Sequence, residues 1–260
     1  MLKINGLDTY YGESKIIDNL SLEVPKGKIV CLIGRNGVGK STTLKSIMGL
    51  TKTPKGSIMF DGKEIIKMKP YVRAKLGIGY VPQGRDIFPQ MTVEENLKLG
   101  LQVKGGKGKI PPNVIDLFPI ISKFMLRKGG DLSGGQQQRV GIARALANQP
   151  DILLMDEPFA SLDAMTRNKM QSELLHIKEK EKMTVIFITH NIQEAISLGN
   201  KIMVMSKNGT IKEKMDNPIS KPVTPASEGY GELWEHLNNA LTEENKEKWS
   251  ESIWGESNNE

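Results

Sequence analysis

The segment Gly34-Arg35-Asn36-Gly37-Val38-Gly39-Lys40-Ser41 decides the fold of this chain, because it fits the pattern G-x-x-x-x-G-K-[ST]. It follows the strand-like run KIVCLIG and precedes a helix expected from Ser41, which is the context that the pattern requires. Glycines let the backbone N–H groups of such a loop close around phosphate oxygens, and the positive end of the next helix adds to the attraction. We expect Lys40 to reach the β and γ phosphates and the Ser41 hydroxyl to bind Mg²⁺. The predicted nucleotide-binding residues of this loop are Gly34, Asn36, Gly37, Gly39, Lys40, Ser41 and Thr42.

Strand-like and helical runs alternate along the rest of the chain. The strand-like runs are GIGYVPQ (77–83), DILLMDE (151–157) and MTVIFITH (183–190), and the last two are followed by helical patterns. This alternation is typical of a parallel sheet covered by helices. The apolar runs are nearly continuous, which indicates strands buried on both faces. We therefore predict an α/β fold with a mainly parallel core sheet.

Two carboxylates are expected to approach the phosphate loop from the strand ILLMDE, residues 152–157. A parallel strand that ends in acidic residues delivers them to the carboxyl edge of the sheet, where the loop also lies. Asp156 is predicted to hold Mg²⁺ and Glu157 to polarise the attacking water. A buried strand that ends in surface acids also occurs by chance, so this prediction depends on its combination with the phosphate loop.

Smaller units are expected around the core sheet. The first 30 residues and GSIMFDGKEI (56–65) show the alternation and glycine turns of an antiparallel sheet. Residues 84–131 read as an inserted helical subdomain, in which Thr92 and Glu95 form a capping box. We predict one domain over residues 1–225, with this insertion, and a tail over residues 226–260.

Charge and composition separate the predicted tail from the body. The chain of 260 residues has a net charge of +6, but residues 226–260 carry −7 and residues 1–225 carry +13. All three tryptophans, Trp234, Trp249 and Trp254, fall in the tail, where leucines recur at helical spacing. Either a helix docked on the body or a solvated tail fits this pattern. The basic body suggests phosphate-bearing partners, although scattered surface lysines would give the same charge.

Composition excludes several classes of protein. No apolar run approaches the roughly 20 residues needed to span a bilayer, and the N-terminus lacks a charged-then-apolar leader, so we expect a chain that is neither membrane-spanning nor secreted. The single cysteine, Cys31, excludes an internal disulfide and fits a reducing cytosol.

The segment Leu132-Ser133-Gly134-Gly135-Gln136, together with the phosphate loop and ILLMDE, resembles the signature of the ABC ATPase family. The resemblance covers roughly residues 1–220 and implies the P-loop NTPase fold of ABC type, with ATP hydrolysis and Mg²⁺ as cofactor. It also implies roles for four further side chains. By resemblance, Tyr11 stacks on adenine, Gln83 senses Mg²⁺ and the γ phosphate, Asp163 lies in the loop that crosses a dimer interface, and His190 contacts the γ phosphate. The resemblance thus implies Lys40, Gln83, Glu157 and His190 as catalytic residues and Ser41, Gln83 and Asp156 as metal ligands.

The family mechanism implies a site shared between two chains. Ser133, Gly135 and Gln136 open a helix and can form an anion site, but they are expected to complete the site of a partner. Two ATPase subunits, identical or different, would then enclose two ATP molecules. The resemblance further implies membrane permease subunits as partners and a peripheral, cytoplasmic location on the inner face of the cell membrane, with no nucleic acid.

The two halves of the chain resemble different members of the family. CLIGRNGVGKSTTLKSIMGL, GIGYVPQGRDIFPQMTVEENL and RKGGDLSGGQQQ look most like ATPase subunits of urea and branched-chain amino acid uptake. The part from about Gln138 or Pro150 onward looks more like those of nitrate, sulfonate and taurine importers. Because the first half includes the segment expected to contact the permease, we expect urea or branched-chain amino acid uptake. Nitrate, sulfonate or taurine import is the alternative. A soluble ABC ATPase acting on nucleic acid or the ribosome, and a module that binds nucleotide without hydrolysis, are further alternatives.

Overall fold

The structure is a computed structural model that describes residues 1–84, 86–106 and 108–254, with side chains described for these residues except Lys104 and 243–254. Its core sheet has the strand order β10-β9-β3-β8-β7-β6. The strands are β3 (Ile29–Ile33), β6 (Ile78–Val81), β7 (Ile152–Asp156), β8 (Thr184–Thr189), β9 (Lys201–Met205) and β10 (Ile211–Asp216). All neighbours pair in parallel except β10, which pairs antiparallel with β9 at one edge. The predicted fold class is confirmed.

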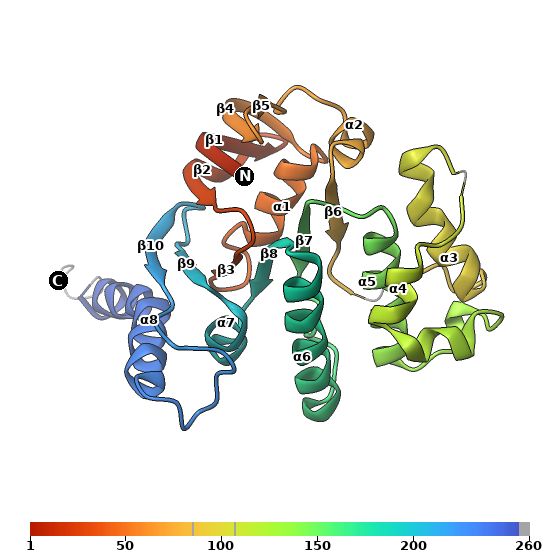
Figure 1. The fold of residues 1–260 in the computed structure, drawn as a ribbon. Coiled ribbons are helices and arrows are strands. Elements are labelled where there is room, and N and C mark those ends of the chain that lie inside the picture. The colour runs from red at the N-terminus through yellow and green to blue at the C-terminus, as the bar shows by residue number, and fades with distance from the viewer. Residues whose placement is uncertain (85, 107, 255–260) are drawn as a thin grey trace.

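Each face of the core sheet packs against a different set of elements (Figure 1). In β3, Val30 and Leu32 belong to a cluster with α1 (Lys40–Met48), whereas Ile29, Cys31 and Ile33 belong to a cluster on the other face. The second cluster includes side chains of α5 (Gly134–Ala147), α6 (Ala164–Glu181) and α7 (Ile192–Leu198). Burial on both faces explains the continuous apolar runs in the sequence.

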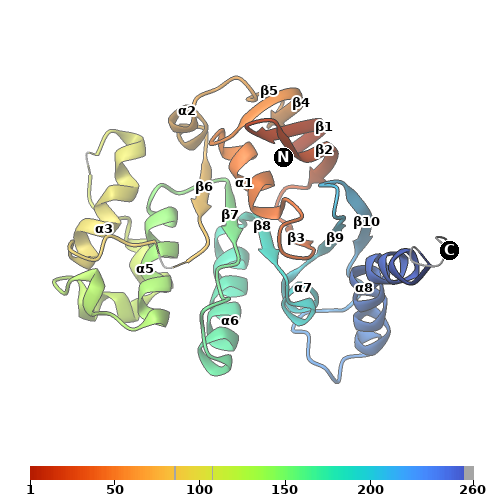
Figure 2. The same cartoon turned by 180° about the vertical axis from the view of Figure 1, so that it is seen from behind.

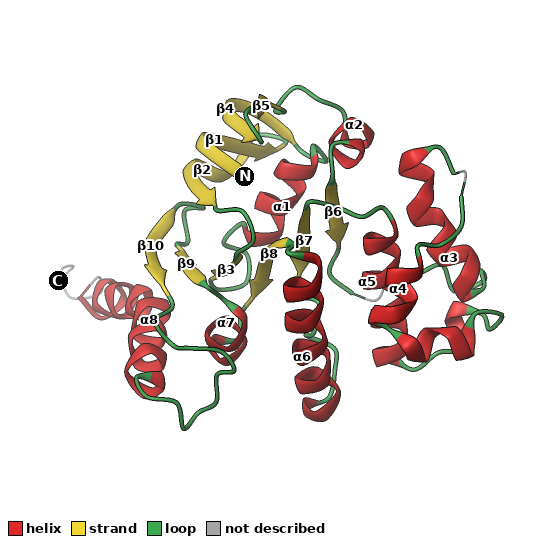
Figure 3. Cartoon of the chain, viewed as in Figure 1, coloured by secondary structure: helices red, strands yellow, loops and turns green. Residues whose placement is uncertain are grey.

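An antiparallel sheet of order β2-β1-β4-β5 covers the face that carries α1 (Figure 3). Its strands are β1 (Leu2–Tyr11), β2 (Ser14–Val24), β4 (Lys52–Phe60) and β5 (Lys63–Glu64), and the short helix α2 (Pro70–Lys75) follows. Leu2, Ile4 and Leu7 of β1 are fully or almost fully buried and share one cluster with Leu44 and Ile47 of α1. The antiparallel sheet therefore packs on the helix that follows the phosphate loop.

The segment between β6 and β7 consists of helices and turns that lie to one side of the core sheet (Figures 1 and 2). These elements are α3 (Val93–Gly100), η1 (Leu101–Lys104), α4 (Pro112–Leu117), η2 (Pro119–Phe124), η3 (Gly129–Asp131) and α5. The capping box of Thr92 and Glu95 is present at the start of α3. Asn96 is buried, and its side chain bonds the backbone of Phe88, Met91 and Thr92, which fixes the loop before α3.

The last element, α8 (Tyr230–Trp254), lies beside α7 and β10 in both views of the molecule (Figures 1 and 2). Leu237 is 0% exposed and Ala240 is 5% exposed, and both join the core cluster of α5, α6 and α7. Trp234 is 39% exposed, while the side chains of Trp249 and Trp254 lie outside the described residues. Within the described residues, α8 thus docks through apolar side chains. No helix in that part of the chain is long and apolar enough to cross a membrane.

Leu237→Ala is expected to lower the free energy of unfolding by about 2–5 kcal/mol, because it removes buried methyl groups and leaves a cavity under α8. Urea unfolding followed by circular dichroism measures the change. Leu233→Ala is the matched control at a partly buried position on the same helix, and its loss should be smaller. Equal, small losses for both variants would contradict docking through Leu237.

Candidate nucleotide site

The phosphate loop has a backbone shape that depends on glycine at two positions. Gly39, the residue before α1, has φ 101°, a left-handed conformation that side chains disfavour. A Cβ atom at Gly34 would lie 2.9 Å from Val38 Cγ2 and 3.0 Å from the Met205 carbonyl oxygen. At Gly39 the loop therefore needs the backbone conformation that glycine allows, and at Gly34 it packs too closely against Met205 of β9 to accept a side chain.

Lys40 folds back across this loop. Its Nζ donates hydrogen bonds to the carbonyl oxygens of Gly34 (2.8 Å) and Arg35 (2.7 Å), and the residue is 5% exposed. Glu157 Oε1 lies 3.9 Å from the same nitrogen. Burial lowers the pKa of Lys40, and the negative charges of Glu157 and Asp156 oppose this shift. The ammonium group thus stays near the acidic end of β7.

Ser41 and Asp156 form a pair of oxygen donors beside the loop. The Ser41 hydroxyl donates to Asp156 Oδ1 at 2.9 Å, and Asp156 is 1% exposed. Burial raises the pKa of Asp156, while the bond from Ser41 opposes this shift. A hydroxyl and a carboxylate are donors that Mg²⁺ accepts, with phosphate and water oxygens filling its other positions. Among the described residues, no group of three or more His, Cys, Asp or Glu side chains could hold a metal ion by itself.

Glu157 connects the ends of three neighbouring strands. It follows β7 with φ 45°, which is uncommon for a residue with a side chain, and its N–H donates to the Ile188 carbonyl of β8. Glu157 Oε2 accepts from Gln83 Nε2 at 3.4 Å and lies 3.1 Å from His190 Nδ1. The parallel strands β6, β7 and β8 place these three side chains together because their carboxyl ends meet at one edge.

Most of the predicted loop residues surround one cavity of about 240 Å³. It is lined by Asn36, Gly37, Gly39, Lys40, Ser41, Thr42, Gln83 and Glu157. Asp156 joins this group through Ser41, and His190 through Glu157. Tyr11, 47% exposed at the end of β1, does not line the cavity. The structure thus gathers the loop, the acidic strand end and Gln83 around one polar space.

The signature residues Ser133, Gly135 and Gln136 lie outside this cavity. Ser133 caps α5 in a capping box with Gln136. A Cβ atom at Gly135 would lie 2.7 Å from Thr166 Cγ2, so α5 starts against the first turn of α6. Asp163, which caps α6, also lies outside the cavity, and its Oδ1 accepts from Thr166 N at 3.0 Å. Within one chain, these residues form a surface of their own beside the starts of α5 and α6.

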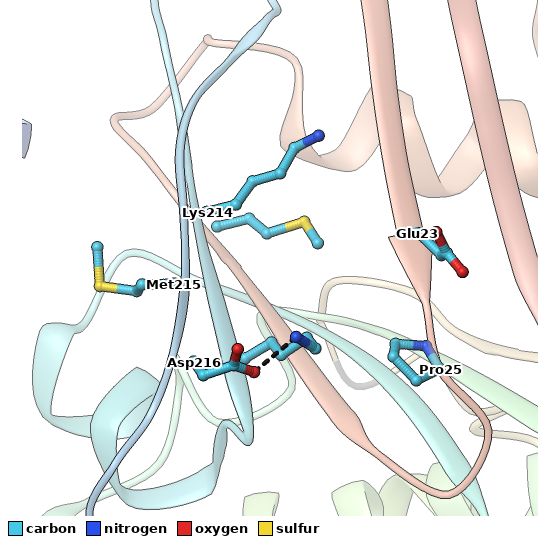
Figure 4. A pocket seen from close by; sticks show the side chains of 7 residues that line it. Glu23, Pro25, Lys214, Met215 and Asp216 are labelled. Carbon is cyan, nitrogen blue, oxygen red and sulfur yellow. Dashed lines mark ion pairs between the residues drawn. The ribbon is translucent and has the colours of Figure 1, made fainter.

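A second cavity lies away from this site, between the end of β2 and strands β9 and β10 (Figure 4). It measures about 460 Å³ and is lined by Glu23, Pro25, Lys201, Met203, Lys214, Met215 and Asp216. Lys201 Nζ pairs with Asp216 Oδ1 at 2.6 Å. None of the predicted site residues lines this cavity.

Sequence reasoning missed two residues near Glu157, namely Arg167 on α6 and Glu194 on α7. Both line a small polar cavity that also touches Glu157 and His190. The available signal was weak, because Glu194 lies three residues after the cap Asn191 and reads as an ordinary helix start.

Comparison with known proteins agrees with this geometry. Residues 17–160 match the ABC transporter family. The chain is 39% identical over 239 residues to an aliphatic sulfonates import ATP-binding protein SsuB of Bacillus cereus, covering 89% of this chain and 92% of the relative. It is 39% identical over 214 residues to the spermidine/putrescine import ATP-binding protein PotA of Clostridioides difficile (strain 630), covering 80% of this chain but only 60% of that relative.

Solved structures show the same fold. A dimeric structure of the post-hydrolysis state of the ATP-binding cassette MJ0796, bound to ADP and Pi, is 31% identical and has a TM-score of 0.74, covering 84% of this chain and 99% of that one. The ADP conformation of the cassette MJ1267 is 29% identical with a TM-score of 0.77, covering 94% of this chain and 97% of that one.

The chain belongs to the ABC transporter family and is an ATP-binding, ATP-hydrolysing member of it. The relatives named above take part in sulfonate and polyamine import. They do not support the expectation of urea or branched-chain amino acid uptake, which came from the first half of the sequence.

Proposed function

We propose that two ATPase subunits, of which this chain is one, hydrolyse ATP at shared sites and drive solute import through membrane permease subunits. The main support for this proposal is the placement of two groups of residues. Glu157 lines the phosphate-loop cavity with Lys40 and Gln83, whereas the exposed helix start at Ser133 lies outside that cavity. A helix start that lies outside the phosphate-loop cavity of its own chain can bind the nucleotide held by a partner chain.

Within one chain, the phosphate loop would bind the β and γ phosphates through backbone N–H groups and the Lys40 ammonium. Ser41 and Asp156 would hold Mg²⁺, with Gln83 beside them, and the ion would neutralise phosphate charge when bound. Glu157 would accept the proton of the attacking water, while His190 orients Glu157 and contacts the γ phosphate. Tyr11, exposed at the end of β1, would stack on adenine.

The second chain would complete the site from its own surface. Ser133, Gly135 and Gln136 would present backbone and side-chain donors to the γ phosphate bound by the partner. Asp163 would lie at the interface, where α5 and α6 start side by side. Loss of the γ phosphate on hydrolysis would remove the group that both chains hold. The dimeric structure of MJ0796 supports this arrangement.

The permease would dock on the helical segment. A cavity of about 410 Å³ lies between α2, β6, α3 and α5, and its lining includes Tyr80, Phe88, Leu99, Val103 and Arg144. Phe88 is 52% exposed and Arg144 stacks on its ring at 5.5 Å. An exposed aromatic side chain beside an arginine is typical of an interface anchor. We assign residues 84–131 to this inserted subdomain and residues 226–260 to a tail, and we place the subunit at the inner face of the cell membrane through its permease.

An organic sulfonate is the solute class that we propose. The match to SsuB covers 92% of that relative, against 60% for PotA, and the second half of the sequence resembles the same group of importers. The ATPase touches nucleotide and permease rather than solute, so the test is the choice of permease. Stimulation of ATP turnover by a sulfonate permease, and not by polyamine or urea permeases, is the expected result; stimulation only by one of the others would contradict the assignment.

Phe88→Ala is expected to reduce this stimulation by at least about tenfold, because it removes a side chain whose contact with the permease would contribute about 1.4 kcal/mol or more. Basal turnover should stay within about twofold, because Phe88 does not line the phosphate-loop cavity. Steady-state ATP turnover with and without reconstituted permease measures both quantities. Tyr71→Ala is the matched control, since Tyr71 is also an exposed aromatic residue (60%) but does not line the cavity. Unchanged stimulation in Phe88→Ala would contradict docking here.

A further inference from the structure

A small polar cavity shares Glu157, and no other lining residue, with the phosphate-loop cavity. Its volume is about 40 Å³. The residues that line it come from the loop between β7 and α6, from α6, from the end of β8 and the turn after it, and from α7; they are Glu157, Ala160, Arg167, Thr189, His190, Asn191 and Glu194. Its walls therefore join the hydrolytic glutamate and histidine to α6, which begins directly after Asp163.

Glu194 is the buried acid of this cavity, with 5% exposure. Its Oε2 accepts from the Thr189 hydroxyl at 2.6 Å, and Thr189 is the last residue of β8, immediately before His190. The Thr189 oxygen also accepts from Asn191 N at 3.0 Å. Both residues that flank His190 are thus held in one hydrogen-bond network with Glu194. Burial raises the pKa of Glu194, while the Thr189 bond and the charge of Arg167 oppose this shift.

Arg167 links the same acid to the loop of Asp163. Its Nη2 donates to the Leu162 carbonyl at 2.9 Å, one residue before Asp163. Its Nε is buried, has no hydrogen-bond partner among the described residues, and faces Glu194 Oε1 at 3.6 Å. A buried guanidinium donor without a bond is costly, and a shift of less than about 1 Å would bring this pair to hydrogen-bond distance. The Arg167–Glu194 ion pair would therefore tighten to a hydrogen bond with a small movement of the loop.

We propose that Arg167 and Glu194 are positioning residues that transmit the placement of the Asp163 loop to His190 and Glu157. The path runs from the Leu162 carbonyl through Arg167, Glu194 and Thr189 to the backbone that carries His190, which in turn contacts Glu157 at 3.1 Å. Contact of the loop with a second chain would move Arg167 toward Glu194 and fix the hydrolytic pair. This inference rests on the proposed roles of Glu157, His190 and the shared dimer.

If Arg167 and Glu194 formed a purely structural ion pair, their replacement would have a different effect. Such a pair would contribute to the free energy of unfolding and leave turnover per folded molecule unchanged. A positioning pair acts on the geometry of the reacting groups, where a displacement of about 1 Å can cost about 100-fold in rate. Because nucleotide is held by the phosphate loop and not by this cavity, loss of the pair should lower kcat and leave KM for ATP in place.

The experiment measures kcat and KM for Mg-ATP, together with thermal unfolding, in Glu194→Gln, Arg167→Gln and the double variant. Glu194→Gln keeps the shape of the side chain and an acceptor for Thr189 but removes the charge that attracts Arg167. We expect kcat to fall at least about tenfold, or about 1.4 kcal/mol in the barrier, with KM within about twofold. The double variant should be no slower than the slower single variant, because both act through one contact. Asp216→Asn, which removes the exposed carboxylate that pairs with Lys201 away from this cavity, is the control and should keep wild-type kcat.

Arg167→Lys keeps the inference testable if Glu194→Gln does not fold. Lysine retains the positive charge but lacks the two separately directed donors that reach Leu162 and Glu194. Its kcat should lie between those of wild type and Arg167→Gln. Wild-type kcat in the folded variants, or losses that multiply in the double variant, would overturn the inference. Those results would leave the proposed function standing if Glu157→Gln is inactive, whereas an active Glu157→Gln would overturn the proposed function itself.

Discussion

Glu157→Gln is expected to hydrolyse ATP at least about 100-fold more slowly than the wild type, while its affinity for ATP stays within about twofold. The amide has the shape of the carboxylate but cannot accept a proton from the attacking water. It can still accept from Gln83 through its oxygen and remain near Lys40, so the cavity keeps its lining. The variant should therefore bind ATP but fail to hydrolyse it.

Glu157→Gln should also form a stable dimer in Mg-ATP, and light scattering after size-exclusion chromatography measures the mass of that dimer. If the γ phosphate holds two chains together, Glu157→Gln should elute with twice the mass of one chain in ATP and as a monomer in ADP. Glu179→Gln, an exposed acid on α6, is the matched control and should turn over ATP at the wild-type rate. Near-normal turnover of Glu157→Gln would contradict its role as the base.

Lys40→Ala is expected to lose hydrolysis by at least about 100-fold for a different reason, namely weak ATP binding. Its ammonium is a buried cation beside the predicted phosphate position, and charge-assisted hydrogen bonds contribute about 1.5–3 kcal/mol each. The same change removes the bonds that Lys40 gives to the Gly34 and Arg35 carbonyls.

Equilibrium binding of a fluorescent ATP analogue separates this variant from Glu157→Gln. Lys40→Ala should bind the analogue weakly and stay monomeric in ATP, and its circular dichroism should match the wild type. Lys63→Ala on β5 is the control for loss of an exposed lysine. Wild-type affinity in Lys40→Ala would contradict the assignment of the phosphate loop.

The proximity of the phosphate loop to Asp156 and Glu157 was predictable because the signals are local. Lys40 and Ser41 lie in one octapeptide, and Asp156 ends an apolar run, so the sheet rule alone brings them together. The Thr92 capping box was likewise visible in four residues. Such features depend on neighbours in sequence.

The contacts that escaped prediction join residues far apart in sequence. Glu194 faces Arg167 from a different helix, and the Arg35 side chain of the phosphate loop donates to the Leu241 carbonyl of α8 at 3.1 Å. The hydrophobic periodicity of the sequence indicates which face of a helix is buried, but not which other helix packs against it. The solute was beyond reach for another reason, because the motifs in the sequence are those predicted to bind nucleotide, and that chemistry would be the same for every solute.

The shared site is the central claim, and mixing two inactive chains tests it most directly. In a dimer of one Lys40→Ala chain and one Ser133→Arg chain, one site carries both defects and the other carries neither. If pairing is no better than random, about half of the pairs are mixed, so the mixture should recover at least about a quarter of wild-type turnover although each variant alone is inactive. A mixture that hydrolyses ATP no faster than its two components measured separately would contradict the account, because each chain would then have to hold a complete site of its own.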